Sequence, residues 1–172
     1  MIYLDNAATT KISKPALDAA LSVLNDVYGN PSSLHKVGTS SAQMVNKARE
    51  QIAKFIGATP DEIIFTAGGS ESDNLALRGI APYLKKIGKT TIITSQIEHH
   101  AVLNTCKALE KDGFKVVYMP VDEDGRVDIE ELERVMSIFK DSLGLVSIKT
   151  VNNDVGSIQL IDDIGNLCLE YD

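Results

Sequence analysis

A Gly-Gly-Ser turn is the first segment of the sequence whose residue types suit chemistry. Gly68, Gly69 and Ser70 follow the apolar run 62–66 and precede a stretch with helical periodicity. Free backbone N–H groups at the start of a helix attract anions, and glycines let a phosphate approach the backbone closely. Ser70 adds a hydroxyl donor. The turn is therefore a candidate phosphate site, although the same residues also form ordinary turns.

A histidine pair follows the apolar run 90–95, in the triplet Glu98-His99-His100. A histidine at the end of a strand stacks on a cofactor ring, ligates a metal or transfers a proton, or it serves only as a structural hydrogen-bonding residue. Adjacent histidines do not share one metal with good geometry, and no cysteine or acidic cluster nearby completes a zinc shell. The pattern favours ring stacking or proton transfer as the functional alternatives.

Two asparagines follow the apolar run 143–148. Asn152 and Asn153 precede Asp154 and Gly156, and residues of these types form tight turns. The functional alternative is that one amide donates a hydrogen bond to a ligand oxygen. Residue types alone leave both interpretations open.

The elements that position these residues alternate between helix and strand. Ser13 is expected to cap the first helix, Asp128 and Glu131 have capping-box spacing, and Asp162 is expected to cap the last helix. Such alternation implies a largely parallel sheet, in which ligands bind outside the carboxyl ends of the strands. The predicted strands are 62–66, 90–95, 115–119 and 143–148, and the predicted helices are 14–28, 38–56, 70–86, 100–111, 129–139 and one from 162 to the terminus.

Composition excludes several classes of protein. The 172 residues are 44% hydrophobic and 24% charged, which suits a globular domain. The net charge of -7 and the lack of a basic patch argue against nucleic-acid binding. No apolar run approaches the roughly 18 residues of a membrane helix, and the N-terminus lacks signal-peptide features, so a cytoplasmic protein is expected. Cys106 and Cys168 lack CxxC spacing and are expected to be buried apolar residues.

Together these loops resemble one family, the cysteine desulfurases of the NifS/IscS type within the class V aminotransferases. The block around Gly69 is similar to the family's phosphate loop, and the blocks around His99 and Asn153 are similar to its ring-stacking and asparagine motifs. There are departures: Gly69-Ser70 stands where the family usually has Ala-Thr, and Asp154 where it has Glu. The similar segments are 3–10, 29–33, 48–50, 62–76, 98–103 and 152–159.

The resemblance implies part of the large domain of fold type I, the fold of transferases that depend on pyridoxal 5'-phosphate (PLP): an α/β domain with a mostly parallel sheet flanked by helices. Residues 1–13 would be an N-terminal segment and residues 14–172 the PLP-binding domain. The implied enzyme is a homodimer that takes sulfur from L-cysteine, leaves L-alanine and an enzyme persulfide, and passes sulfur to an acceptor protein for iron–sulfur clusters or other sulfur-trafficking pathways.

The resemblance also assigns roles to four residues. Gly69 and Ser70 would bind the PLP phosphate. His99 would stack on the pyridine ring and take part in catalysis by proton transfer. Asn153 would donate a hydrogen bond to the phenolic oxygen of PLP.

Other parts of the family pattern fall beyond residue 172, including the Schiff-base lysine, the partner of the pyridinium nitrogen and the nucleophilic cysteine. The chain is therefore expected to be a fragment or a split subunit, inactive alone and marginally stable. Two alternatives stay open. One is another class V enzyme such as a selenocysteine lyase, and the other is a non-catalytic scaffold.

Overall fold

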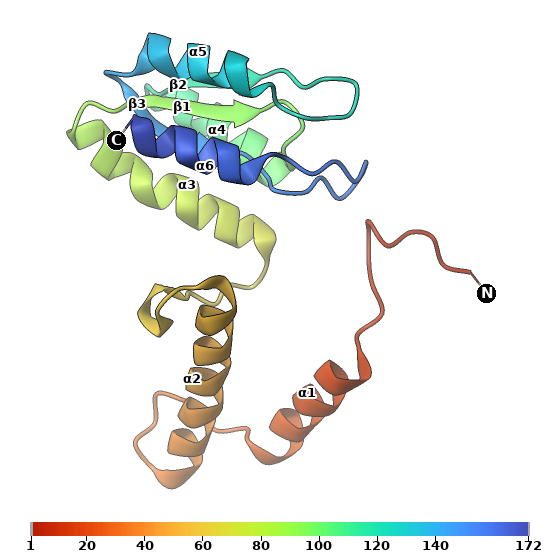
Figure 1. Ribbon diagram of the computed structural model, residues 1–172. Coiled ribbons are helices and arrows are strands. Elements are labelled where there is room, and N and C mark those ends of the chain that lie inside the picture. The colour runs from red at the N-terminus through yellow and green to blue at the C-terminus, as the bar shows by residue number, and fades with distance from the viewer. Residues whose placement is uncertain (1, 172) are drawn as a thin grey trace. The chain divides into compact units, whose positions relative to one another are not determined.

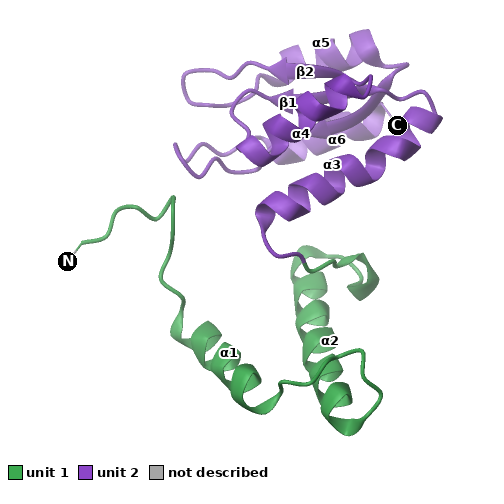
Figure 2. Cartoon of the chain, turned by 180° about the vertical axis from the view of Figure 1, so that it is seen from behind, with its two compact units in different colours: residues 1–65 green, residues 66–172 purple. Residues whose placement is uncertain are grey.

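The computed structural model describes residues 2–171, and the chain divides into two compact units (Figure 1; Figure 2). Unit 1 comprises residues 1–65 and unit 2 comprises residues 66–172. This division falls inside the predicted domain 14–172, whose extent stays a prediction. Among residues 2–171, no helix has both the length and the apolar character needed to cross a bilayer.

Unit 1 consists of helices α1 (Lys14–Asp26) and α2 (Lys36–Ile56) and the short 3-10 helix η1 (Pro60–Glu62). The Ser13 hydroxyl accepts a hydrogen bond from the Ala16 N–H over 3.4 Å, which confirms the predicted cap. Gly57 ends α2 with φ 73°, a left-handed conformation that glycine adopts without strain. Both helices therefore match their predictions to within two residues at each end.

The predicted strand 62–66 is wrong. The structure ends η1 at Glu62, whose carboxylate accepts from the Thr59 N–H over 2.7 Å. Ile64 is 69% exposed and Phe65 48% exposed, and neither lies in a strand. A strand needs a hydrogen-bonded neighbour, and the described sheet lies entirely in unit 2. A β-branched apolar run supplies propensity for a strand but no partner.

Unit 2 is an α/β unit built on three parallel strands in the order β2-β1-β3. The central strand β1 is buried along its whole length, as expected for a strand covered on both faces. This confirms the predicted parallel sheet. The elements in chain order are α3 (Gly69–Lys86), β1 (Thr91–Ser95), α4 (His100–Lys111), β2 (Lys115–Met119), α5 (Ile129–Phe139), β3 (Leu143–Ser147) and α6 (Ile161–Glu170) (Figure 1).

Helices cover both faces of this sheet. Ile92 packs in a cluster with residues of α3 and α4, among them Leu77 and Val102. The next residue, Ile93, packs in a second cluster with Leu132 of α5 and residues of α6. Successive side chains of a strand point to opposite faces, so these two isoleucines anchor the two halves of the core. The result is three layers that hold the carboxyl ends of the strands at one edge.

Cys106 of α4 lies in the first cluster and is completely buried, which confirms the expected role of this cysteine as an apolar core residue. Burial raises the pKa of the Cys106 thiol from its ordinary value of 9.0 to about 11, and the nearby carboxylates of Glu110 and Glu98 act in the same direction. A thiol with this pKa stays protonated at neutral pH, so Cys106 is a poor nucleophile.

This raised pKa predicts a loss of stability in alkali. The folded-state pKa of Cys106 lies above the unfolded value, so the contribution of the protonated thiol is complete below pH 9 and is lost as the pH rises toward 11. We expect the melting temperature to fall more steeply over that interval in the wild type than in Cys106→Ala, which has no thiol to ionise. Equal slopes in thermal melts monitored by circular dichroism would contradict this prediction.

Candidate functional site

Helix α3 begins at the predicted phosphate turn. Gly68 is extended, and its carbonyl accepts the N–H groups of Glu71 and Ser72 over 3.1 Å each. Within residues 2–171 the N–H groups of Gly69 and Ser70 and the Ser70 hydroxyl have no hydrogen-bond acceptor. A Cβ built on Gly69 would meet nothing within 4 Å, so the backbone is open to an approaching group. The start of α3 therefore offers free donors to an anion.

The loop that enters α3 is held by short hydrogen bonds. The Glu71 carboxylate accepts from the Ala67 N–H over 2.6 Å, and the hydroxyls of Thr66 and Ser72 lie 2.7 Å apart. The Thr66 hydroxyl also donates to the Gly68 carbonyl over 3.2 Å. These bonds fix the turn just before the free donors. The backbone that would contact an anion therefore has a conformation fixed by hydrogen bonds.

His99 is the N-cap of α4, and its Nδ1 accepts from the Ala101 N–H over 3.1 Å. In the neutral ring, this bond assigns the proton to Nε2, because a nitrogen that accepts carries no hydrogen. The His99 ring is exposed, and it lies 6.4 Å from the His100 ring at a tilt of 58°. At this distance and tilt the two rings are not stacked on each other.

Ser70 and His99 line one cavity of about 350 Å³ between the N-terminal halves of α3 and α4. The structure thus brings together two of the predicted site residues, and Gly69 adjoins the first of them. Asn153 is not among the residues that line this cavity. The lining consists of Ser70, Asn74, Arg78, His99, His100, Ala101, Asn104 and Thr105.

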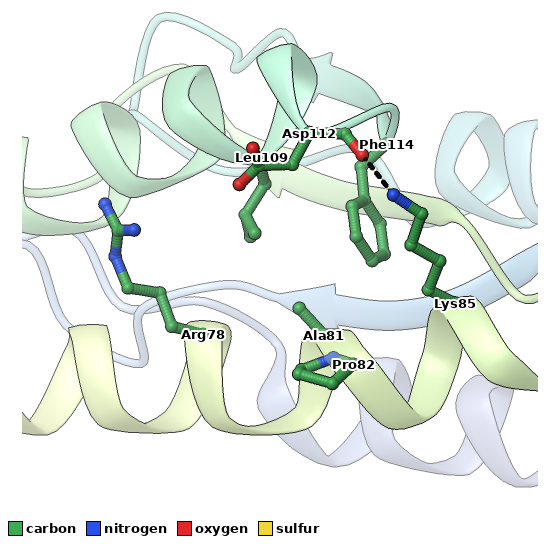
Figure 3. A pocket seen from close by; sticks show the side chains of 7 residues that line it. All are labelled: Arg78, Ala81, Pro82, Lys85, Leu109, Asp112 and Phe114. Atoms are coloured by element: carbon green, nitrogen blue, oxygen red, sulfur yellow. Dashed lines mark hydrogen bonds between the residues drawn. The ribbon is translucent and has the colours of Figure 1, made fainter.

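A second cavity, of about 320 Å³, lies between the C-terminal halves of the same two helices (Figure 3). Arg78 and Lys85 project from α3 on either side of Ala81 and Pro82, and the Lys85 ammonium donates to the Asp112 carbonyl over 2.8 Å (Figure 3). None of the predicted site residues lines it. The predicted residues that line a cavity of this helix pair, Ser70 and His99, therefore lie at the end where α3 and α4 begin.

The two asparagines after β3 have different environments. Asn152 is buried: its Nδ2 donates to the Ile97 carbonyl over 3.2 Å, and its Oδ1 accepts from the Asp154 N–H over 2.8 Å. Asn153 is exposed, and its Nδ2 donates to the Asp154 carboxylate over 3.1 Å. The turn interpretation therefore holds for Asn152, while the predicted contact of Asn153 with PLP stays a prediction.

This contrast predicts different effects of truncation. Asn152→Ala is expected to lower the free energy of unfolding by about 1–3 kcal/mol, because it breaks the hydrogen bonds that this buried amide makes with two backbone groups. Asn153→Ala, the matched control, is expected to change it by less than about 0.5 kcal/mol, as for other surface substitutions. Urea unfolding measures both values, and a larger loss for Asn153→Ala would contradict the assignment.

Glu98 supports the loop beside the site, a role that the sequence interpretation missed. It is 7% exposed, and its carboxylate accepts from the Ser95 hydroxyl over 2.7 Å and from the Lys149 N–H over 2.8 Å. It thus bonds the end of β1 to the segment after β3. The sequence shows only an acidic residue between a predicted strand and a histidine. It does not show that this residue is buried. Glu98 holds the loop that leads to His99, the N-cap of α4.

No metal centre accompanies these residues in the part of the chain that the structure describes, where no group of three or more histidine, cysteine or acidic side chains is arranged to hold an ion. The site consists instead of free backbone donors, a serine hydroxyl and an exposed imidazole. That donor set suits an anionic ligand with a flat ring better than a cation.

Comparison with known proteins gives the family. The profile of the family described as Aminotransferase class-V matches residues 2–172. "Cysteine desulfurase IscS" of Dictyoglomus turgidum is 47% identical over 171 residues, which are 99% of this chain and 42% of that protein. "Cysteine desulfurase, mitochondrial" of Drosophila melanogaster is 47% identical over 97% of this chain and 36% of its own length. The chain thus spans less than half the length of these relatives.

Two solved structures have the same fold. A "NIFS-LIKE PROTEIN" superposes with a TM-score of 0.93 at 42% identity, covering 99% of this chain and 46% of that one. "SspA in complex with cysteine" superposes with a TM-score of 0.89 at 39% identity, covering 98% and 48%. Profile, sequence relatives and structures agree over nearly the whole chain. The chain belongs to the class V aminotransferase family.

Proposed function

We propose that this chain supplies the cofactor-binding part of a PLP-dependent cysteine desulfurase. The observation that carries the proposal is the single cavity at which Ser70, beginning α3, and His99, capping α4, meet. Family membership and the names of the curated relatives support it. These names also favour a desulfurase over a selenocysteine lyase or a non-catalytic scaffold.

The residues present fit PLP. Its phosphate suits the free N–H groups of Gly69 and Ser70, because the helix dipole favours negative charge at this end of α3. Its pyridine ring suits the exposed face of His99. The Arg78 guanidinium lines the same cavity and adds positive charge. When bound, PLP supplies an electron sink for reactions at the α-carbon of an amino acid.

The side chains of this chain would orient the bound ligand and transfer protons. Because Nδ1 of His99 is bonded to the Ala101 N–H, Nε2 is the atom at which His99 would give up or regain a proton. Glu98 and Asn152 hold the loops at this edge of the sheet in place. Asn153 would donate its amide to the phenolic oxygen of PLP, as the family motif implies. Cys106 is buried and protonated, so it is unsuited to accept sulfur.

The names of the relatives support a proposal for the activity of the complete protein. The substrate would be L-cysteine, in keeping with the similar structure "SspA in complex with cysteine". The enzyme would be a cytoplasmic homodimer that passes sulfur to an acceptor protein, with a covalent lysine and a nucleophilic cysteine that the motifs matched here do not include. These assignments belong to the proposal.

The proposal is tested by comparing PLP with pyridoxal, which lacks the phosphate. Equilibrium dialysis is expected to show saturable binding of PLP that inorganic phosphate displaces. PLP is expected to bind at least about tenfold more tightly than pyridoxal, because charge-assisted hydrogen bonds to the phosphate contribute 1.5 kcal/mol or more. Equal affinities for the two compounds would show that the start of α3 is not a phosphate site.

A further inference from the structure

One side-chain amide joins the two helices that carry the proposed cofactor-binding residues. Asn74 lies one turn after Ser70 on α3, and its Nδ2 donates to the Ser70 carbonyl over 2.9 Å. Its Oδ1 accepts from the hydroxyl of Thr105 on α4 over 2.8 Å. The amide thus bonds the first turn of the phosphate-binding helix to the helix that His99 caps.

The partners of this amide allow only one orientation. The Arg78 guanidinium donates through Nε to the same oxygen, Oδ1, over 3.0 Å. Guanidinium groups only donate and backbone carbonyls only accept, so exchanging the oxygen and nitrogen of Asn74 would break both bonds. The amide therefore has a defined direction between α3 and α4.

The Thr105 end of the connection is largely buried, although Thr105 is among the residues that line the cavity. Thr105 is 2% exposed, so bulk water has little access to its hydroxyl. Hydrogen bonds in such surroundings are stronger than those at the surface, and breaking one leaves a buried group unpaired. The connection consequently resists sliding of α3 along α4.

We propose that Asn74 and Thr105 are positioning residues that fix the separation between the phosphate end of the cofactor site, at Ser70, and its ring end, at His99. This inference rests on the proposed function. PLP carries its phosphate and its ring on one small molecule, so it gains both sets of contacts only when the two helix starts are correctly separated. A ligand with only one of these groups is insensitive to that separation.

Two substitutions at one position isolate the hydrogen bond. Thr105→Val removes the hydroxyl and keeps the shape of the side chain, whereas Thr105→Ser keeps the hydroxyl and removes a methyl group. Dissociation constants of the full chain for PLP, pyridoxal and inorganic phosphate are measured for each. Thr105→Val is expected to weaken PLP binding by about two- to tenfold, the range for one lost hydrogen bond. Its affinities for pyridoxal and for inorganic phosphate stay unchanged, and Thr105→Ser binds PLP like the wild type.

Other results overturn the inference. Unchanged PLP affinity in Thr105→Val shows that the hydrogen bond does not fix the separation between the two ends of the cofactor site. Equal weakening for all three ligands shows a general loss of structure and not a lost separation. A wild-type chain that does not bind PLP contradicts the proposed function instead. The inference is then decided by ligand-free amide resonances of Gly69 and Ser70: a shift in Thr105→Val but not in Thr105→Ser supports it, and unshifted resonances overturn it.

Discussion

Replacing Leu132 with alanine is expected to lower the free energy of unfolding of unit 2 by about 2–5 kcal/mol. Leu132 is completely buried on α5, in the cluster that also contains Ile93 and Ile164. Truncation removes apolar contacts and leaves a cavity beneath the sheet, and both effects destabilise the folded state. Such a loss is a large part of the 5–15 kcal/mol typical of folded domains.

The same helix offers a control. Ile138 lies on α5 and is 60% exposed, so Ile138→Ala is expected to change the free energy of unfolding by about 0.5 kcal/mol or less. Chemical denaturation followed by circular dichroism reports both variants. Similar losses for the two would mean that α5 does not pack on the sheet through Leu132.

Ser70→Ala is expected to weaken PLP binding by about 10- to 100-fold, because a hydrogen bond to a charged group contributes about 1.5–3 kcal/mol. The Ser70 hydroxyl lines the cavity shared with His99 and has no acceptor among residues 2–171, so removing it breaks no internal bond. The melting temperature without ligand should therefore stay the same.

A matched substitution outside the site distinguishes a local effect on PLP binding from an effect on the whole chain. Ser40 lies on α2 in unit 1, is exposed, and donates to the Lys36 carbonyl over 3.1 Å. Ser40→Ala is expected to leave the dissociation constant for PLP, measured by fluorescence titration, at its wild-type value. If Ser70→Ala binds PLP as tightly as Ser40→Ala does, the Ser70 hydroxyl does not contribute to PLP binding.

The sequence predicted those elements whose limits are set locally. Helix α4 ends beside Gly113, and α5 starts after Asp128, whose carboxylate accepts from the Glu131 N–H over 3.0 Å, so both were predicted to the residue. The expected cap at Asp162 was wrong, because α6 begins at Ile161 and Asp162 lies in its first turn. An acid in the first turn favours a helix start nearly as well as a cap, and the sequence does not separate the two.

Contacts between residues far apart in the chain could not be predicted from the sequence. Residues 62–66 have strand propensity, but a strand also needs a hydrogen-bonded neighbour, and none of the described strands pairs with them. Asn152 and Asn153 are the same residue type in adjacent positions, so only the fold shows which amide is buried. The bond between Asn74 and Thr105 joins residues 31 apart and left no signal in the spacing.

The most direct test of a PLP site between the starts of α3 and α4 is a titration of the ¹⁵N-labelled chain with PLP, followed by amide and imidazole resonances. We expect saturable shifts at Gly69, Ser70 and the His99 ring, and unchanged resonances at Phe114, which lines the second cavity. Shifts centred on Phe114, or none that saturate at the helix starts, would contradict this account of the site.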